Sequence, residues 1–371
     1  MITSSRGFDL QVGSDTDYIH DVAFNYFGTR VAFCTSRQKI SIWEKKAVAD
    51  SFPREAATPS TAQTGGSFAA LSKSFGGPAG LGAGPGSSIL SHSAADDTQL
   101  EWKEIATIDC AHSGPIWRLD WANPEFGPGV FVSCGEDRAV NVWSERTYGE
   151  RSGWKKRASR LDATKAVVDV RFAPRHHGLK MASASLDGFV RVYEAPDALN
   201  LGDWLTEDYC ISNSREGVQA LSWSPDIYAE YIAAVGTDGK VYIHTKNVRK
   251  WEQLHSERHH AEPGSVKDVQ FSPNLCRPYD LLVTCGRDAK LWRFDTGPEQ
   301  TKLTVLRVLC EGPDLIWRGN WNMTGTMLTL SPESGDIQVW TVNARGEWAS
   351  SYEIRHKDES VSIKQSASVL A

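Results

Sequence analysis

Hydrophobic and polar positions alternate in short runs along most of this chain. The run "VVDVRF" (167–172) places apolar residues at nearly every second position, as in a strand with one buried face. A turn with proline or glycine follows, then a run of small apolar residues such as "KMASAS" (180–185), and then a run that ends in an aromatic residue such as "VRVY" (190–193). Apolar residues at helical spacing are almost absent, so the sequence predicts an all-β fold.

Aromatic residues recur at fixed places in these runs and reveal a repeat. The first set closes the first run of each unit: Phe24, Trp121, Phe172, Trp223, Phe271 and Trp321. The second set closes the third run: Trp43, Trp143, Tyr193, His244, Trp292 and Trp340. Neighbouring members of each set are 48 to 51 residues apart, except for a first step of about twice that length. Four short strands per unit at this spacing are typical of a β-propeller blade. The sequence therefore predicts six blades, which begin near Ile19, Ile116, Val167, Val218, Val266 and Ile316.

An acidic turn precedes the aromatic-ended strand in four of the units. The residues concerned are Asp137, Asp187, Asp238 and Asp288. An aspartate in such a turn accepts backbone N–H groups, so these residues are predicted to be structural and not catalytic. Arg37 and Ser334 occupy the same place in the first and last units. The terminal blades are therefore the degenerate ones, and terminal repeats that break a pattern usually face something other than a sibling repeat.

The long first step contains an insertion at about 46–97. Between Ser74 and Ala95 it has no charged residue and consists mostly of Gly, Ser, Ala and Pro. Such a segment buries too little apolar surface to offset its ordering entropy, so we expect a disordered insertion within the first blade. Residues 356–371 are expected to form a flexible tail, and residues 1–355 a single propeller domain.

The remaining composition points away from chemistry. The net charge of −6 does not favour nucleic-acid binding, and no apolar run suggests a signal peptide or a membrane-inserted segment. The seven cysteines form no CxxC pair, and the chain has no GxSxG, HExxH or Walker motif. The pairs His176–His177 and His259–His260 fall in turns. We therefore expect no enzyme activity, no metal and no cofactor.

Several phrases resemble one family of WD-repeat proteins. These are "IHDVAFNYFGTRVAFCTS", "WANPEFG", "FAPRHHGLKMASASLDGFVRVYEAPDALNLGDW" and "IWRGNWNMTGTML". They are similar to the small WD-repeat nucleoporins of the Seh type, which belong to the Y-shaped scaffold of the nuclear pore. The resemblance extends from about Tyr18 to Val342 and excludes the insertion. The vesicle-coat protein Sec-thirteen is the nearest related type, and a Sec-thirteen-like coat subunit is the alternative identity.

The resemblance implies six blades in an open ring, with a seventh blade donated by a partner. The implied partner is a helical Y-complex scaffold nucleoporin with an ancestral coatomer domain. It also implies a related scaffold subunit of a vacuolar or lysosomal coat-like complex that regulates nutrient signalling. The implied locations are the nuclear pore at the nuclear envelope and the surface of the vacuole or lysosome.

The strand order gives a separate reason to expect an open ring. The last blade has its own outer strand at 348–354, so the N-terminal "GFDLQV" is not needed to complete it. An open ring exposes two apolar blade faces. The predicted walls of the opening are Val22, Phe24, Val31 and Phe33 on the first blade, and Ile316, Trp317, Trp321, Leu328 and Val339 on the last. The alternative is a closed ring whose channel or top face binds short peptides.

Overall fold

Each repeat forms one antiparallel sheet whose strands follow each other in chain order. The computed structural model describes residues 17–47, 100–127, 129–148, 151–212, 216–247, 250–258, 264–297, 301–312, 314–343, 345–357 and 360–365. Within these residues there are six sheets, which we call blades one to six. The all-β, six-bladed prediction is confirmed. The helical segments among the described residues are the short 3-10 turns Pro124–Phe126 and Arg175–His177.

The strands of the blades have the following bounds. Blade one contains β1 (Ile19–Phe24), β2 (Arg30–Thr35), β3 (Ile40–Ala47) and β4 (Leu100–Ile108). Blade two contains β5 (Ile116–Trp121), β6 (Val130–Gly135), β7 (Val140–Tyr148) and β8 (Arg151–Arg160). Blade three contains β9 (Val167–Phe172), β10 (Lys180–Ser185), β11 (Phe189–Glu194) and β12 (Leu205–Ser212). Blade four contains β13 (Val218–Trp223), β14 (Tyr231–Gly236), β15 (Lys240–Asn247) and β16 (Lys250–Arg258). Blade five contains β17 (Asp268–Phe271), β18 (Asp280–Cys285), β19 (Asp288–Thr296) and β20 (Thr301–Glu311). Blade six contains β21 (Ile316–Trp321), β22 (Met327–Pro332), β23 (Ile337–Val342), β24 (Trp348–Lys357) and β25 (Ser360–Gln365).

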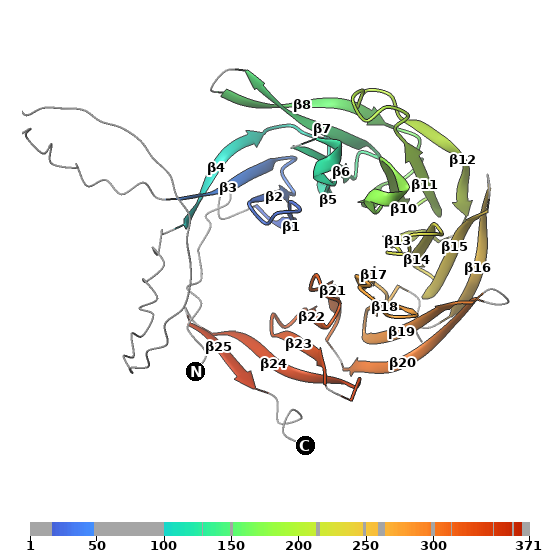
Figure 1. The fold of residues 1–371 in the computed structure, drawn as a ribbon. Helices are drawn as coiled ribbons and strands as arrows, with labels where there is room; N and C mark the ends of the chain where they lie inside the picture. Colours follow the sequence, from blue (N-terminus) through green and yellow to red (C-terminus); the bar gives the residue numbers. More distant parts are fainter. Residues whose placement is uncertain are drawn as a thin grey trace, which may run out of the picture. The chain divides into compact units, whose positions relative to one another are not determined.

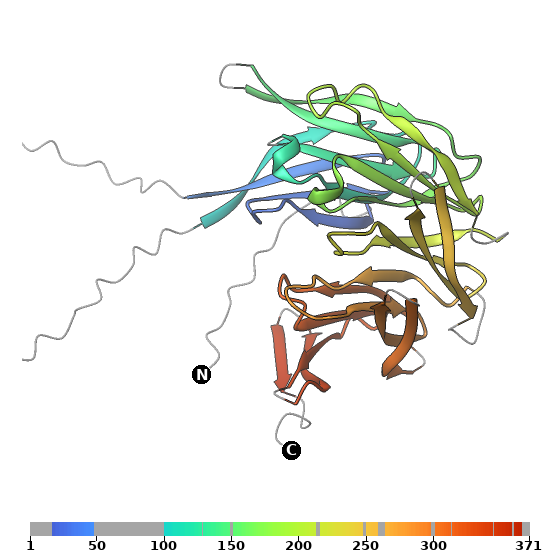
Figure 2. The same ribbon diagram turned by 45° about the vertical axis from the view of Figure 1, so that its right-hand side comes forward.

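The blades succeed one another around a common centre. The first strand of each blade is innermost and the others follow outward, ending with the fourth strand in blades one to five and with β25 in blade six (Figures 1 and 2). Inner strands pack in sequence order: β1 on β5, β5 on β9, β9 on β13, β13 on β17, and β17 on β21. Each contact brings together two blades that are adjacent in the chain. The centre of the ring is therefore lined by the residues of these six strands.

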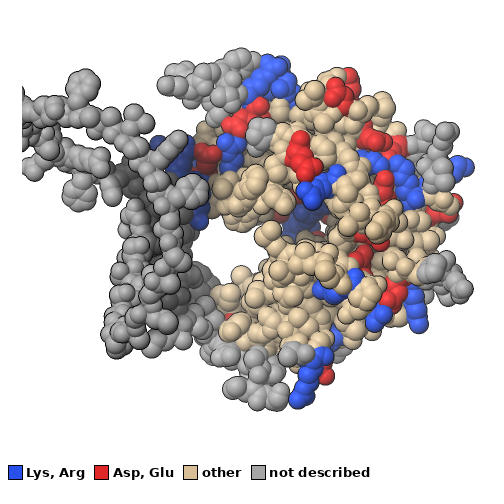
Figure 3. All heavy atoms as spheres, in the orientation of Figure 1, with Lys and Arg blue, Asp and Glu red and all other residues tan. Residues whose placement is uncertain are grey.

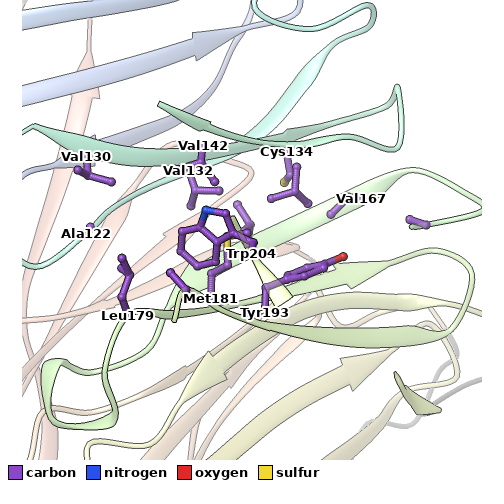
Figure 4. Packing of buried hydrophobic residues seen from close by; sticks show 14 residues of the cluster. Ala122, Val130, Val132, Cys134, Val142, Val167, Leu179, Met181, Tyr193 and Trp204 are labelled. Carbon is purple, nitrogen blue, oxygen red and sulfur yellow. The ribbon is translucent and has the colours of Figure 1, made fainter. Parts of the chain in front are cut away.

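Apolar clusters between adjacent blades form the core. Figure 4 shows the one between blades two and three, where Val132 and Val142 of blade two face Met181 and Tyr193 of blade three. Four further clusters join blades one and two, three and four, four and five, and five and six. Small or β-branched side chains on one blade thus pack against larger or aromatic side chains of the next blade. In the described part of the chain, no such cluster joins blade six to blade one.

The ends of the predicted domain differ in detail from the expectation. The chain divides into two units, and residues Lys45–Trp102 form the smaller one. The insertion predicted at 46–97 lies outside the described residues, apart from the end of β3. The tail predicted to be flexible from residue 356 contains the end of β24 and the strand β25, which pairs with β24 along its outer edge.

Candidate functional site

The two faces of a blade have different neighbours, and the first blade shows the difference most clearly. We call the face toward the preceding blade the leading face and the face toward the following blade the trailing face. The leading face of blade two is formed by Leu119, Trp121, Phe131 and Trp143, all of them buried. They pack on the trailing face of blade one, which is formed by Ala32, Cys34, Ile40 and Ile42.

The leading face of blade one has the same cross-strand rows. One row joins Phe24, Val31 and Trp43, and the next joins Val22, Phe33 and Ser41. Phe24 is 58% exposed and Val22 is 44% exposed, whereas their counterparts Trp121 and Leu119 are buried. The inner strand β1 therefore presents an apolar face that no described blade covers.

The middle strands of blade one behave differently from β1. Val31 and Phe33 are buried, although neither belongs to the cluster with blade two. Trp43 Nε1 is buried and has no hydrogen-bond partner among the described residues. In blade two the equivalent Trp143 Nε1 donates to Ser133 Oγ at 2.9 Å. Phe33 stands at the position of Ser133, so blade one has replaced the acceptor by an apolar side chain.

The residues predicted as the wall on blade six are divided between its two faces. Ile316 and Leu328 are buried in the cluster with blade five, and Trp321 packs against that cluster. Trp317 is 47% exposed and stacks with Lys267 of blade five, while Val339 lies on the trailing face. A β-bulge between Ile316 and Arg318 explains why adjacent residues of β21 have such different surroundings.

The trailing face of blade six is more polar than those of the other blades. Thr329 pairs with Val339 across β22 and β23, and Ser331, two residues further along β22, lies on the same face. The equivalent positions on β14 of blade four are occupied by buried Ala233 and Val235. A sheet that covers blade six must therefore meet hydroxyl groups as well as apolar side chains.

Hydrogen bonds between neighbouring inner strands hold each blade to the next. Asp21 accepts from Leu119 N at 3.0 Å, and Asp120 accepts from Phe172 N at 2.7 Å. At the other three contacts between consecutive blades, bonds of the same kind run from Leu221 N to Asp169, from Phe271 N to Ser222 Oγ, and from Gly319 N to Asp268. Every contact between consecutive blades thus contains one backbone N–H bonded to a side-chain acceptor of the preceding blade.

Buried charges cross the centre of the ring. Arg118 of β5 contacts Asp268 of β17 at 3.1 Å and Asp169 of β9 at 3.6 Å, and the partly buried Arg171 contacts Asp169 within β9 at 3.3 Å. Burial raises the pKa of Asp120 to about 6, against the opposing effects of Arg171 and the Phe172 amide. Burial likewise raises the pKa of Asp268. Because both signs are present and paired, the centre is a network of ion pairs and not a site for a single charged ligand.

One side chain links the first and last inner strands directly. Arg318 Nη2 donates to His20 O at 3.3 Å and lies 3.4 Å from Asp21 Oδ1. Beside this link is a cavity of about 680 Å³, lined by β1 and by residues that include Arg118, Asp120, Arg171, Asn320 and Ser331. The two strands therefore approach at one point, while a hollow separates the rest of their length.

The aspartates of the acidic turns bind backbone groups. Asp137 accepts from Ser113 N and Ala139 N and contacts His112 Nδ1 at 2.9 Å. Burial by itself would raise the pKa of Asp137, but these partners outweigh it and lower the pKa to about 2. Asp187 accepts from Thr164 N and Phe189 N, and Asp238 accepts from Lys240 N. Asp288 forms an ion pair with Lys290 at 2.7 Å, as Asp187 does with Arg191 at 2.9 Å.

Sequence reasoning missed the residues that connect the inner strands. Their signal is an alternation at the third position before the first aromatic of each unit: Asp21, Arg118, Asp169, Ala220, Asp268 and Arg318. Opposite charges at one repeat position indicate contact between repeats.

The predicted turn histidines His176 and His177 both contact Asp226 O. Among the described residues, no group of side chains could hold a metal ion, and no helix has the length and apolar character to cross a membrane.

Comparison with known proteins identifies the family. No family model matches the chain. Nucleoporin SEH1 of Danio rerio is 30% identical, over 90% of this chain and 83% of that protein. The chain belongs to the SEH1 nucleoporin family. Nucleoporin SEH1 of Xenopus tropicalis is also 30% identical and that of Homo sapiens is 29% identical, each over 90% of this chain and 84% of the relative. A chain of the solved mitotic checkpoint complex matches this SEH1-family fold with a TM-score of 0.57 and 12% identity, over 89% of this chain and 76% of that chain. That likeness concerns the fold alone.

Proposed function

We propose that the chain is a non-enzymatic architectural subunit of the nuclear pore whose ring is completed by strands of another protein. The observation that carries this proposal is the leading face of blade one. Val22 and Phe24 are exposed there, at positions that every later blade covers with its predecessor. Strand addition would bury this face and would supply main-chain hydrogen bonds to the incoming sheet.

The partner that fits this role is a helical scaffold nucleoporin of the Y-complex with an ancestral coatomer domain. The SEH1 family membership supports it, because the named relatives are nucleoporins. The same face would serve a related scaffold subunit of a vacuolar or lysosomal coat-like complex, which the resemblance to the Seh type also implies. The nuclear pore at the nuclear envelope is the corresponding location. The family membership favours this identity over a Sec-thirteen-like vesicle-coat subunit.

A closed peptide-binding ring fits the packing less well. In such a ring the leading face of blade one would pack on the trailing face of blade six, which carries Thr329 and Ser331. The charges on the face seen in Figure 3 are of both signs and interspersed around the rim, as expected for a surface without a preference for nucleic acid.

The interface with added strands would resemble a core cut in half, with about 2,000 Å² or more buried.

A charge on the exposed face of β1 tests the proposal. We expect Phe24→Asp to abolish co-purification with the helical scaffold nucleoporin of the same species, because a carboxylate would be buried without a partner. Phe27→Asp is the matched control: Phe27 lies in the next turn of the same blade and is 67% exposed, but it is not part of the β1 rows. Equal binding by Phe24→Asp and Phe27→Asp would overturn the proposal.

A further inference from the structure

The five hydrogen bonds in which a backbone N–H of one inner strand donates to a side chain of the preceding one follow a two-step pattern. Blades one, three and five use an aspartate at the third residue before the aromatic, and the bonded N–H belongs to Leu119, Leu221 or Gly319. Blades two and four use the residue directly before the aromatic, Asp120 or Ser222. In these two cases the bonded N–H belongs to the aromatic residue that ends the next inner strand, Phe172 or Phe271.

Blade six carries the acceptor of this pattern without the donor. Asn320 stands directly before Trp321, as Asp120 stands before Trp121 and Ser222 before Trp223. Its side chain is exposed and lines the cavity beside β1. The nearby Thr329 hydroxyl donates to the backbone carbonyl of Asn320 and not to its side chain. Among the described residues, the Asn320 carboxamide has no hydrogen-bond partner. The carboxamide is thus an acceptor at the edge where a further inner strand would lie.

We propose that Asn320 Oδ1 accepts the backbone N–H that ends the inner strand of the donated sheet, and that this bond sets the register of that strand. The inference rests on the proposed function, and it specifies the partner's chemistry. By analogy with Phe172 and Phe271, the donating residue carries a large apolar side chain that packs on the trailing face of blade six. That side chain would meet Met327, Thr329 and Val339.

The bond matters because the donated strand becomes buried. A buried backbone N–H without an acceptor loses its bond to water and gains nothing in return. A shift of one residue would also turn every side chain of the strand to the opposite face. One fixed acceptor at the end of β21 is therefore enough to distinguish the correct register from its neighbours.

Substitutions at Asn320 with and without an acceptor test the inference. Asn320→Leu keeps the size of the side chain and removes the acceptor, whereas Asn320→Asp and Asn320→Ser introduce the acceptors that blades two and four use at this position. We expect the complex with the purified helical scaffold nucleoporin to dissociate about tenfold faster for Asn320→Leu, and within about threefold of wild type for the other two. All three isolated variants should unfold at the wild-type temperature, since the carboxamide has no bond within the described chain.

The outcomes separate this inference from the proposed function. Wild-type binding together with an unchanged dissociation rate for Asn320→Leu would overturn the role of Asn320 and leave strand addition standing. Equal weakening by Leu, Asp and Ser would also overturn it, because packing and not the acceptor would then decide. Absence of wild-type binding would overturn both proposals.

Discussion

At the scale of single residues, His244 occupies a position that four other blades fill with tryptophan and one with tyrosine. It is buried and stacks with Tyr242, and burial lowers its pKa to about 4. The unfolded chain takes up a proton near pH 6.5, whereas the folded chain does so only near pH 4, so stability is lost as the pH falls between these values.

This pKa gives a testable pH dependence. When the pH falls from 7 to 4, the unfolding free energy of wild type should decrease by about 3 kcal/mol more than that of His244→Phe, because the folded protein keeps His244 neutral. Denaturant unfolding of both proteins at the two pH values measures the difference. Parallel losses of stability in wild type and variant would contradict the buried, neutral histidine.

The folded protein favours the charged form of Asp137, whereas it favours the neutral form of His244. Because its pKa is held at about 2, its stabilisation is present above pH 4 and is lost as the pH falls from about 4 to about 2. Asp137→Ala should destabilise the protein by roughly 1–3 kcal/mol at neutral pH, since the amides of Ser113 and Ala139 lose their acceptor. Thermal unfolding measures this, with the exposed Asp109→Ala as control. A wild-type midpoint for Asp137→Ala would show that the turn does not depend on the carboxylate.

Single residues also mark what the sequence could and could not predict. The fifty-residue spacing located the acidic turns, because a turn position depends only on local order. The direction of a strand residue is not local: Ile316 and Trp317 are adjacent and both apolar, and only the bulge determines that one is buried against blade five. The pattern also could not distinguish exposed Phe24 from buried Phe33, because both lie on the leading face of blade one and differ only in what packs against them.

At the scale of elements, blade one accommodates the long connection between two adjacent strands. The strands β3 and β4 are neighbours in one sheet, although β3 ends at Ala47 and β4 begins at Leu100. Strand runs with apolar alternation were predictable, whereas β25 was not, since "SVSIKQ" has no counterpart in the other repeats. Its pairing with β24 comes from the free edge of the outer strand and not from periodicity.

The connection itself can be shortened in an experiment. Deletion of residues 57–94 should leave the unfolding midpoint within about 2 °C of wild type, because the cost of closing a loop varies slowly with its length. Differential scanning calorimetry of the deletion and the full chain measures this. A loss of more than about 5 °C, or failure to express with the partner, would show that the deleted residues contribute to the fold.

At the scale of the whole molecule, the ring contains five complete blade contacts and a sixth place of a different kind. The complete contacts each combine an apolar cluster with a hydrogen bond between inner strands. At the sixth place the described residues provide an exposed β1 face, the acceptor Asn320 and the single link from Arg318 to Asp21. Periodicity predicts the number of blades, but it carries no information about a strand that belongs to another chain.

The structure of the purified chain bound to its helical scaffold nucleoporin tests this account most directly. We predict a sheet of the partner between β1 and β21, with Val22 and Phe24 buried beneath it. Six blades that close on each other, with nothing between the first and the last, would contradict the account.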